Sequence, residues 1–122
     1  MDENSQNLEQ QLHTLKKQQK DIEESLQKLK REQNEQAWLA EDFARVCLEQ
    51  RESLGFLREV WQGDESRSFS NHLEDLHEEE KRKWHKKIQE NQEKCQQKIN
   101  TYQKSIYQLE TKQQDLQKEL LQ

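Results

Sequence analysis

VWQGDESRSF, residues 60–69, contains the one strong break in this sequence of 122 residues. Gly63 is one of two glycines, and the chain has no proline. Glycine adopts left-handed backbone conformations at little steric cost, so it commonly ends a helix. Asp64, Glu65 and Ser66 suit the start of a following helix, where polar side chains cap free amides and acidic groups complement the helix dipole. The stretch therefore predicts a turn between two helices at the middle of the chain.

The composition on both sides of this break argues against a conventional globular core. Hydrophobic residues make up 29% and charged residues 37% of the chain, and the mean hydropathy is −1.50. Globular domains are usually close to half apolar, which leaves either a disordered chain or long helices that share a narrow apolar stripe. Abundant glutamine, glutamate, lysine and leucine favour helices. We therefore expect an all-α fold with a single domain over residues 1–122.

Apolar residues recur with heptad spacing on both sides of the break. Before it, alternating steps of four and three residues give sixteen positions, twelve apolar and four glutamine: Leu8, Leu12, Leu15, Gln19, Ile22, Leu26, Leu29, Gln33, Gln36, Ala40, Phe43, Cys47, Gln50, Leu54, Leu57 and Trp61. After it, a second ladder contains Phe69, Leu73, Leu76, Glu80, Trp84, Ile88, Gln92, Cys95, Ile99, Tyr102, Ile106, Leu109, Gln113, Leu116 and Leu120. This spacing is typical of a coiled coil, with a stutter where four-residue steps follow one another after Leu76.

The two ladders mirror each other about the break. In the outer part of the chain, ladder positions pair so that their numbers add up to 128, which places Leu12 opposite Leu116. The same mirror places Gln36 opposite Gln92, a polar layer of the kind that fixes register. Two unrelated helices would have no reason to mirror each other. The pattern predicts an antiparallel two-helix hairpin.

The expected hairpin has a first helix over about 4–61, a turn over about 62–65 and a second helix over about 66–120. The turn is centred on Trp61-Gln62-Gly63. Trp61 ends the first ladder and Phe69 begins the second, so the two rings should meet beside the turn. Cys47 and Cys95 fall about 21 Å apart along the hairpin, too far for a disulfide, and are expected to be reduced.

The turn motif, formed by Trp61, Gly63 and Phe69, resembles the Trp-x-Gly motif of the WXG superfamily of small ESAT-like helical hairpins. In WQGDESRSF the tripeptide lies at the turn, and an aromatic residue follows shortly after it. The resemblance implies export by, or service to, a type VII secretion system.

The chain departs from typical members of that superfamily in two ways. It is longer, and it lacks the Tyr-x-x-x-Asp/Glu export signal, because Tyr102 and Tyr107 are followed four residues later by Ile106 and Thr111. In both respects it looks like the accessory partners encoded beside LXG toxins in Gram-positive bacteria. That resemblance implies a targeting factor or chaperone that binds the helical amino-terminal domain of the toxin.

A second apolar stripe lies beside the ladder of the first predicted helix. It consists of Trp38, Leu39, Val46, Phe56 and Val60, of which three share one heptad position and two lie on adjacent lines. A two-helix hairpin buries one stripe per helix, so a further stripe predicts a partner. We expect a helical partner, either the toxin domain or a second WXG-like hairpin, or else a second copy, to complete a four-helix bundle. The alternative is that these residues thicken the local core.

Other functions find little support in the residues. No Gly-rich phosphate loop, nucleophile elbow or paired-acid constellation occurs, so we expect no enzyme and no cofactor. Glu74-x-x-His77 occurs once, whereas a di-iron site in a bundle needs two copies, so no metal is expected. The basic stretch KRKWHKK, residues 81–87, places Trp84 on the ladder and its charges in favourable helix pairs, so nucleic acid is not an expected partner.

Net charge and hydropathy bear on location. The net charge is −5, and no apolar run is long enough to cross a bilayer, so no membrane insertion is expected. The amino terminus is polar and unlike a classical signal peptide. We expect a cytoplasmic protein, or one secreted through a type VII system. The competing functional hypothesis is a generic coiled-coil scaffold or homodimeric structural protein unrelated to secretion.

Overall fold

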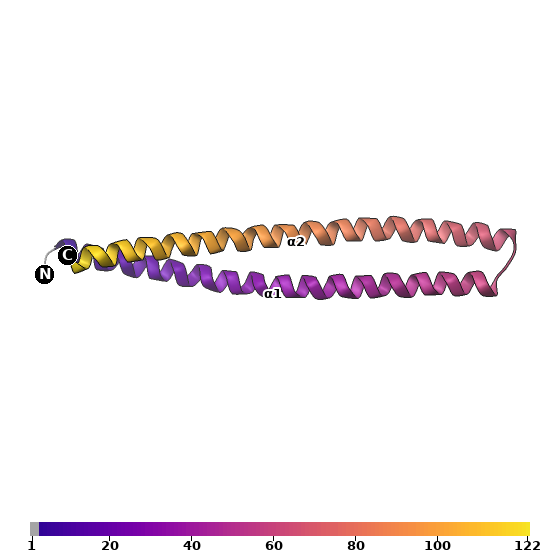
Figure 1. The fold of residues 1–122 in the computed structure, drawn as a ribbon, viewed down its shortest axis with the longest axis horizontal. Coiled ribbons are helices and arrows are strands. Elements are labelled where there is room, and N and C mark those ends of the chain that lie inside the picture. Colours follow the sequence, from indigo (N-terminus) through magenta and orange to yellow (C-terminus); the bar gives the residue numbers. More distant parts are fainter. Residues whose placement is uncertain (1–2) are drawn as a thin grey trace. The chain divides into compact units, whose positions relative to one another are not determined.

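The computed structural model describes residues 3–122 and confirms an all-α helical hairpin. Helix α1 spans Glu3–Val60 and helix α2 spans Asp64–Leu121, joined by a short turn (Figure 1). The predicted turn centre is correct, but the first helix ends one residue earlier and the second begins two residues earlier than expected. Both differences are within the usual uncertainty of helix ends.

The turn is built on the backbone of Gly63. Its φ of 127° is positive, a region that residues with a Cβ rarely adopt. The Trp61 amide donates to the Leu57 carbonyl at 3.0 Å and closes α1, and the Arg67 amide donates to the Gly63 carbonyl at 3.0 Å and opens α2. Asp64 therefore lies inside the first turn of α2. Its negative carboxylate interacts favourably with the positive end of the helix dipole there, and it pairs with Arg67 at 2.7 Å.

Replacing Gly63 with alanine should lower the free energy of unfolding by about 1 kcal/mol, because alanine disfavours positive φ. No atom lies within 4 Å of the added Cβ, so the cost comes from the backbone alone. Gly55 is the matched control, since it lies inside α1 and its Cβ would also meet open space. Gly55→Ala should raise the stability by about 0.5–1 kcal/mol. Urea denaturation followed by circular dichroism measures both, and a Gly63→Ala variant as stable as wild type would contradict this account of the turn.

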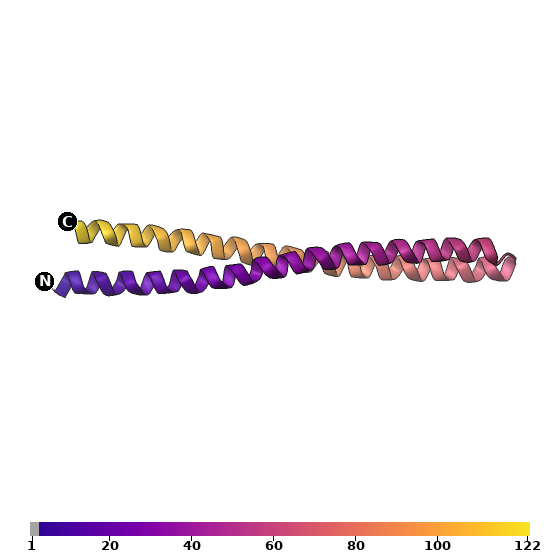
Figure 2. The ribbon, with the colours of Figure 1, turned by 90° about the horizontal axis from the view of Figure 1, so that it is seen from below.

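The helices form two compact units, each with a part of α1 and a part of α2. The terminal unit joins the residues up to Gln33 with Lys94–Gln122, and the turn unit is Asn34–Glu93. Within each unit the two helices run antiparallel, as the chain path in Figure 2 shows.

The terminal unit follows the predicted ladders closely. Its core consists of Leu29, Cys95 and Ile99, with Leu26 and Tyr102 packed against it. These contacts confirm the expected register in this unit. Cys95 donates its thiol to the Leu29 carbonyl, with 3.5 Å between sulfur and oxygen, and it is a free cysteine, as is Cys47 in the turn unit.

Glutamine layers in the terminal unit are hydrogen-bonded across the hairpin. Gln113 donates to Gln19 at 2.6 Å, and Gln33 donates to Gln96 at 2.7 Å. Gln19 and Gln113 are both ladder positions, whereas Gln33 reaches Gln96, which lies one residue beyond the ladder position Cys95. Both hydrogen bonds favour one register of the two helices.

In the turn unit, α2 departs from the predicted ladder. The side chains turned toward α1 are Ser66 and Ser70, which are buried, and Leu73, His77 and Lys81, which are half-buried. The predicted positions Phe69, Leu76, Glu80 and Trp84 are exposed instead. The Ser66 hydroxyl donates to the Trp61 carbonyl and so turns the serine face of α2 inward. Serine is small enough to be covered completely where the two helices meet beside the turn. The larger apolar side chains Phe69, Leu76 and Trp84 lie on the exposed side of α2 instead.

Trp61 and Phe69 lie in contact beside the turn, as their positions on the ladders predicted. Their ring centroids are 5.5 Å apart and tilted by 57°, a favourable aromatic arrangement. Both side chains remain exposed, at 42% and 46% of their maximal area. The aromatic pair therefore stabilises the turn and still presents apolar surface to solvent.

Candidate partner-binding face

Exposed apolar side chains are concentrated in the turn unit. Ten large hydrophobic residues are exposed there: Trp38, Leu39, Val46, Leu48, Phe56, Val60, Trp61, Phe69, Leu76 and Trp84. In the described part of the terminal unit the corresponding residues are Tyr107 and Leu121. The terminal unit thus buries its apolar ladder within the hairpin, whereas the turn unit leaves much of its apolar surface uncovered.

All five residues of the predicted partner stripe are exposed. Trp38 and Phe56 are each 65% exposed, and Leu39 and Val60 are exposed to a similar degree. Val46 is less exposed because it lies at the edge of a groove between α1 and α2. The side chains do not thicken the core, which was the alternative interpretation of this stripe.

The apolar groove brings Val46 together with side chains of α2. It is lined by Phe43, Val46, Cys47, Gln50, Ser53 and Leu54 from α1 and by Leu73, Leu76, His77, Glu80, Lys81 and Trp84 from α2. The other four residues of the predicted stripe lie outside it. Leu76 and Trp84 were assigned to the buried ladder in the sequence, so their contribution to this surface was missed. The irregular four-residue spacing after Leu76 was the available signal.

A second open groove lies between the helices of the turn unit and includes Leu48. Ala40, Ala44 and Leu48 of α1 line it opposite His85 and Ile88 of α2. Leu48 is 55% exposed and was not singled out from the sequence, because it is isolated on its heptad line. The turn unit therefore exposes apolar side chains beside each of these two grooves.

Buried polar atoms without partners are also confined to the turn unit. Among residues 3–122, Gln36 Oε1, Ser70 Oγ and His77 Nε2 are buried and make no hydrogen bond. Gln36 was expected to form a polar layer with Gln92, but its oxygen remains unpaired. Each buried group left unpaired costs about 1–3 kcal/mol. His77 lines the apolar groove, so a molecule docked there can reach the imidazole.

Several charged side chains lie near the exposed apolar residues of the turn unit and are paired within the chain. Arg58 pairs with Glu74 across the hairpin, and Lys83 pairs with Glu79 at 3.4 Å along α2. The Lys87 ammonium lies 5.4 Å from the centre of the Trp84 ring. These pairs are exposed and contribute little to stability, so they are available for exchange with charges on a partner.

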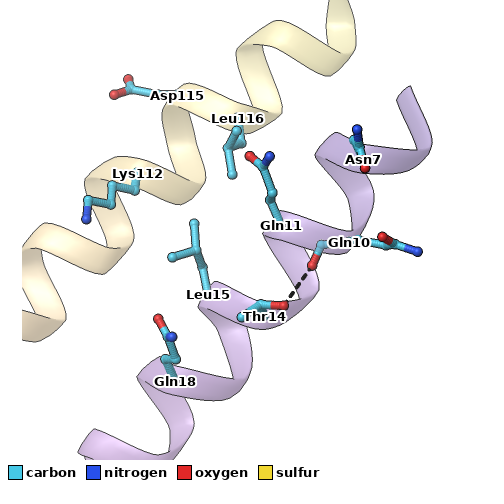
Figure 3. A pocket seen from close by; sticks show the side chains of 9 residues that line it. All are labelled: Asn7, Gln10, Gln11, Thr14, Leu15, Gln18, Lys112, Asp115 and Leu116. Carbon is cyan, nitrogen blue, oxygen red and sulfur yellow. Dashed lines mark hydrogen bonds between the residues drawn. The ribbon is translucent and has the colours of Figure 1, made fainter. Parts of the chain in front are cut away.

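The far end of the terminal unit offers a different kind of surface. An open groove there is lined by Asn7, Gln10, Gln11, Thr14, Leu15, Gln18, Lys112, Asp115 and Leu116 (Figure 3). Leu15 and Leu116 approach each other across it, and Thr14 donates to the Gln10 carbonyl at 3.0 Å. Seven of its nine lining residues carry amide, hydroxyl or charged groups, and Leu15 and Leu116 are the two apolar ones.

Residues 3–122 contain neither a cluster of metal-ligating side chains nor a helix that could span a membrane. No group of three or more His, Cys, Asp or Glu side chains in this range is placed to hold a metal ion. Glu74, the carboxylate of the Glu-x-x-His pair, binds Arg58 instead. Neither described helix contains an apolar stretch long enough to cross a membrane.

No protein-family model, curated protein or solved structure matches this chain. The resemblance to WXG hairpins consequently depends on the turn motif and on its place between the two helices.

Proposed function

We propose that the chain is a non-enzymatic protein–protein interaction module. Its partner face comprises Trp38, Leu39, Val46, Phe56 and Val60 of α1. The observation that supports the proposal is the concentration of exposed large apolar side chains in the turn unit, compared with two in the described part of the terminal unit. Exposed apolar patches of this kind mark interaction sites in soluble proteins.

The expected occupant of the partner face is an amphipathic helix or a helical hairpin. Leu39, Val46 and Val60 share one heptad position of α1, at spacings of seven and fourteen residues, which matches the heptad period of a second helix packed alongside. Full burial of one Leu, Val or Phe side chain contributes about 1.5–3 kcal/mol. Trp38 adds a side-chain type that is enriched among the residues that dominate binding energy.

We infer the class of the partner from the resemblance to WXG hairpins. The Trp61-Gln62-Gly63 turn and the missing Tyr-x-x-x-Asp/Glu signal favour an accessory partner of an LXG toxin. In this role the chain covers apolar stripes on the toxin's amino-terminal helices in the cytoplasm and acts as a chaperone and targeting factor for type VII secretion. The chain then either remains in the cytoplasm or leaves with the toxin.

Co-expression with the helical amino-terminal domain of an LXG-type toxin encoded nearby tests this function. We expect a stable complex that survives size-exclusion chromatography, with an affinity of about 1 µM or tighter, corresponding to about −8 kcal/mol. A coiled-coil domain of similar length from an unrelated protein is the control and should not bind. If no toxin domain binds and none is encoded nearby, the chain is better described as a coiled-coil scaffold unrelated to secretion.

A further inference from the structure

A pocket at the turn, which we call the turn pocket, is lined by hydrogen-bond donors. It has a volume of about 570 Å³ and is formed by the end of α1, the turn and the first two turns of α2. Two arginines, two serines and two side-chain amides line it: Arg58, Arg67, Ser66, Ser70, Gln62 and Asn71. Among the residues that the structure describes, none that lines the pocket is acidic, although the chain contains 25 acidic residues. The lining therefore suits an anion.

Ser70 contributes a buried hydroxyl without a partner to the turn pocket. The residue is 1% exposed, and its Oγ makes no hydrogen bond within residues 3–122. Ser66, which is buried to the same degree, donates its hydroxyl to the Trp61 carbonyl. A buried hydroxyl that lacks a partner is costly, and an acceptor bound in the pocket would satisfy it. Ser70 thus points to a ligand in this pocket.

The turn pocket includes the amino-terminal end of α2. Gly63 and Ser66 line it, and Gly63 has no side chain with which to cap the helix. Among residues 3–122, no group accepts a hydrogen bond from the amides of the first three residues of α2, Asp64, Glu65 and Ser66. Free amides and the positive end of the helix dipole favour anions, and phosphate groups commonly bind there. This end of the helix therefore adds to the attraction that the two arginines exert.

Both arginines are paired with exposed carboxylates that do not line the turn pocket. Arg67 pairs with Asp64 at 2.7 Å, and Arg58 pairs with Glu74 across the hairpin. Asp64 is almost fully exposed and Glu74 is half exposed. Exposed ion pairs contribute little to stability, so an anion can replace these carboxylates at small cost. Guanidinium groups bind phosphate through two parallel hydrogen bonds, which makes phosphate a strong competitor.

An aromatic ring lies beside these polar groups. Trp61 lines the turn pocket, remains 42% exposed and packs against Phe69, with 5.5 Å between the ring centroids. The volume of the pocket leaves room for an organic group attached to the phosphate. Such a group can pack on the indole ring, and an aromatic group does so most favourably.

We propose that the turn pocket binds a small phosphate monoester. The phosphate oxygens accept hydrogen bonds from Arg58, Arg67 and Ser70, and the organic part lies against Trp61. Arg58 belongs to α1 and Arg67 to α2, so the ligand bridges the two helices and stabilises the hairpin at its turn. The pocket shares no residue with the partner face. The inference therefore goes beyond the proposed function and does not depend on it.

An NMR titration of the full chain with phenyl phosphate tests the proposal, at about pH 7.5, where a phosphate monoester carries nearly two negative charges. The amide signals of Ser66, Arg67 and Ser70 should shift to saturation with a dissociation constant of about 1 mM or tighter. Inorganic phosphate should bind at least about threefold more weakly, because it has no group to pack on Trp61. Phenol, which lacks the phosphate, should not bind. The ionic strength is held constant with sodium chloride, because salt screens exposed charges.

Two variants of the turn pocket separate binding from folding. Arg67→Gln should weaken binding of phenyl phosphate at least about tenfold, and Ser70→Ala at least about threefold. Ser70→Ala also removes the unpaired buried hydroxyl, so the variant should melt at or above the temperature of wild type. Weaker binding by a chain of undiminished stability cannot come from a disturbed fold.

Arg45→Gln is the matched control for Arg67→Gln. Arg45 pairs with Asp42 three residues away at 3.1 Å, as Arg67 pairs with Asp64, but it lies outside the turn pocket. This variant should bind phenyl phosphate like wild type. The proposal is overturned if the wild-type signals do not shift up to about 20 mM phenyl phosphate, or if inorganic phosphate binds as tightly. Equal losses of affinity in Arg45→Gln and Arg67→Gln would also overturn it, since they would indicate a general attraction of the chain's positive charges for anions.

Discussion

Replacing Val46 and Phe56 together with aspartate should weaken binding of the helical partner at least about 100-fold, equivalent to about 2.7 kcal/mol. Both side chains are exposed in the free chain and belong to the partner face. In the complex each aspartate would place a charge in an apolar contact, where desolvation is costly. Because exposed substitutions outside the core change stability little, the variant should remain helical. Isothermal titration calorimetry with the toxin domain measures the loss.

The matched control for this variant uses the exposed apolar residues of the terminal unit. Tyr107→Asp with Leu121→Asp introduces the same charges at side chains that are 70% and 88% exposed. This control should bind the partner like wild type. If Val46→Asp with Phe56→Asp also binds with wild-type affinity, the partner face is assigned to the wrong surface.

Replacing Ile99 with aspartate should lower the free energy of unfolding by about 3–5 kcal/mol. Ile99 is 3% exposed and lies in the core of the terminal unit with Leu29 and Cys95. The substitution removes apolar contacts and buries a carboxylate that has no cationic partner in that core. Thermal denaturation followed by circular dichroism measures the effect as a large fall in the melting temperature.

The neighbouring exposed substitution Asn100→Asp is the control for Ile99→Asp. It adds the same charge one residue further along α2, on the exposed surface, and should change stability by no more than about 0.5 kcal/mol. Equal stability of the two variants would show that Ile99 does not form part of a tightly packed core.

The fold could be predicted from the sequence because the first ladder is long and regular. From Leu8 to Cys47, every predicted ladder position of α1 is buried or half-buried. Four-and-three spacing over so many heptads specifies one face of a helix, and the mirrored second ladder specifies its antiparallel partner. From Ile88 onward the predicted positions of α2 are buried or half-buried as well.

The prediction failed for α2 near the turn, where small polar residues replace apolar ones. Ser66 and Ser70 are each 1% exposed, although a search for apolar periodicity passes over them. The stutter after Leu76 made the phase of the ladder ambiguous, and the apolar positions Phe69, Leu76 and Trp84 then suggested the wrong face. The bond from Ser66 to the Trp61 carbonyl decides the phase, and it depends on the turn geometry rather than on hydrophobic pattern.

The partner stripe of α1 could be predicted because its residues lie off a well-defined ladder. Once the ladder positions are known, Leu39, Val46 and Val60 have no place inside a two-helix hairpin. The contributions of Leu76 and Trp84 could not be predicted in the same way, since they depend on the phase of α2. Residues that line a groove between two helices can be predicted only when the register of the helices and the phase of each ladder are both known.

The distance between spin labels at positions 30 and 98 tests most directly whether the chain folds back at Gly63 in this register. Lys30→Cys and Lys98→Cys, in a chain with Cys47→Ser and Cys95→Ser, place both labels on exposed sites of the terminal unit. Dilution with unlabelled chain removes distances between copies. The axes of packed helices lie about 8–10 Å apart. Double electron–electron resonance should therefore give a narrow distribution of label-to-label distances at about 10–25 Å. A single helix continuing through Gly63 would separate these positions by about 100 Å at 1.5 Å per residue, and a distance near that value would contradict the hairpin.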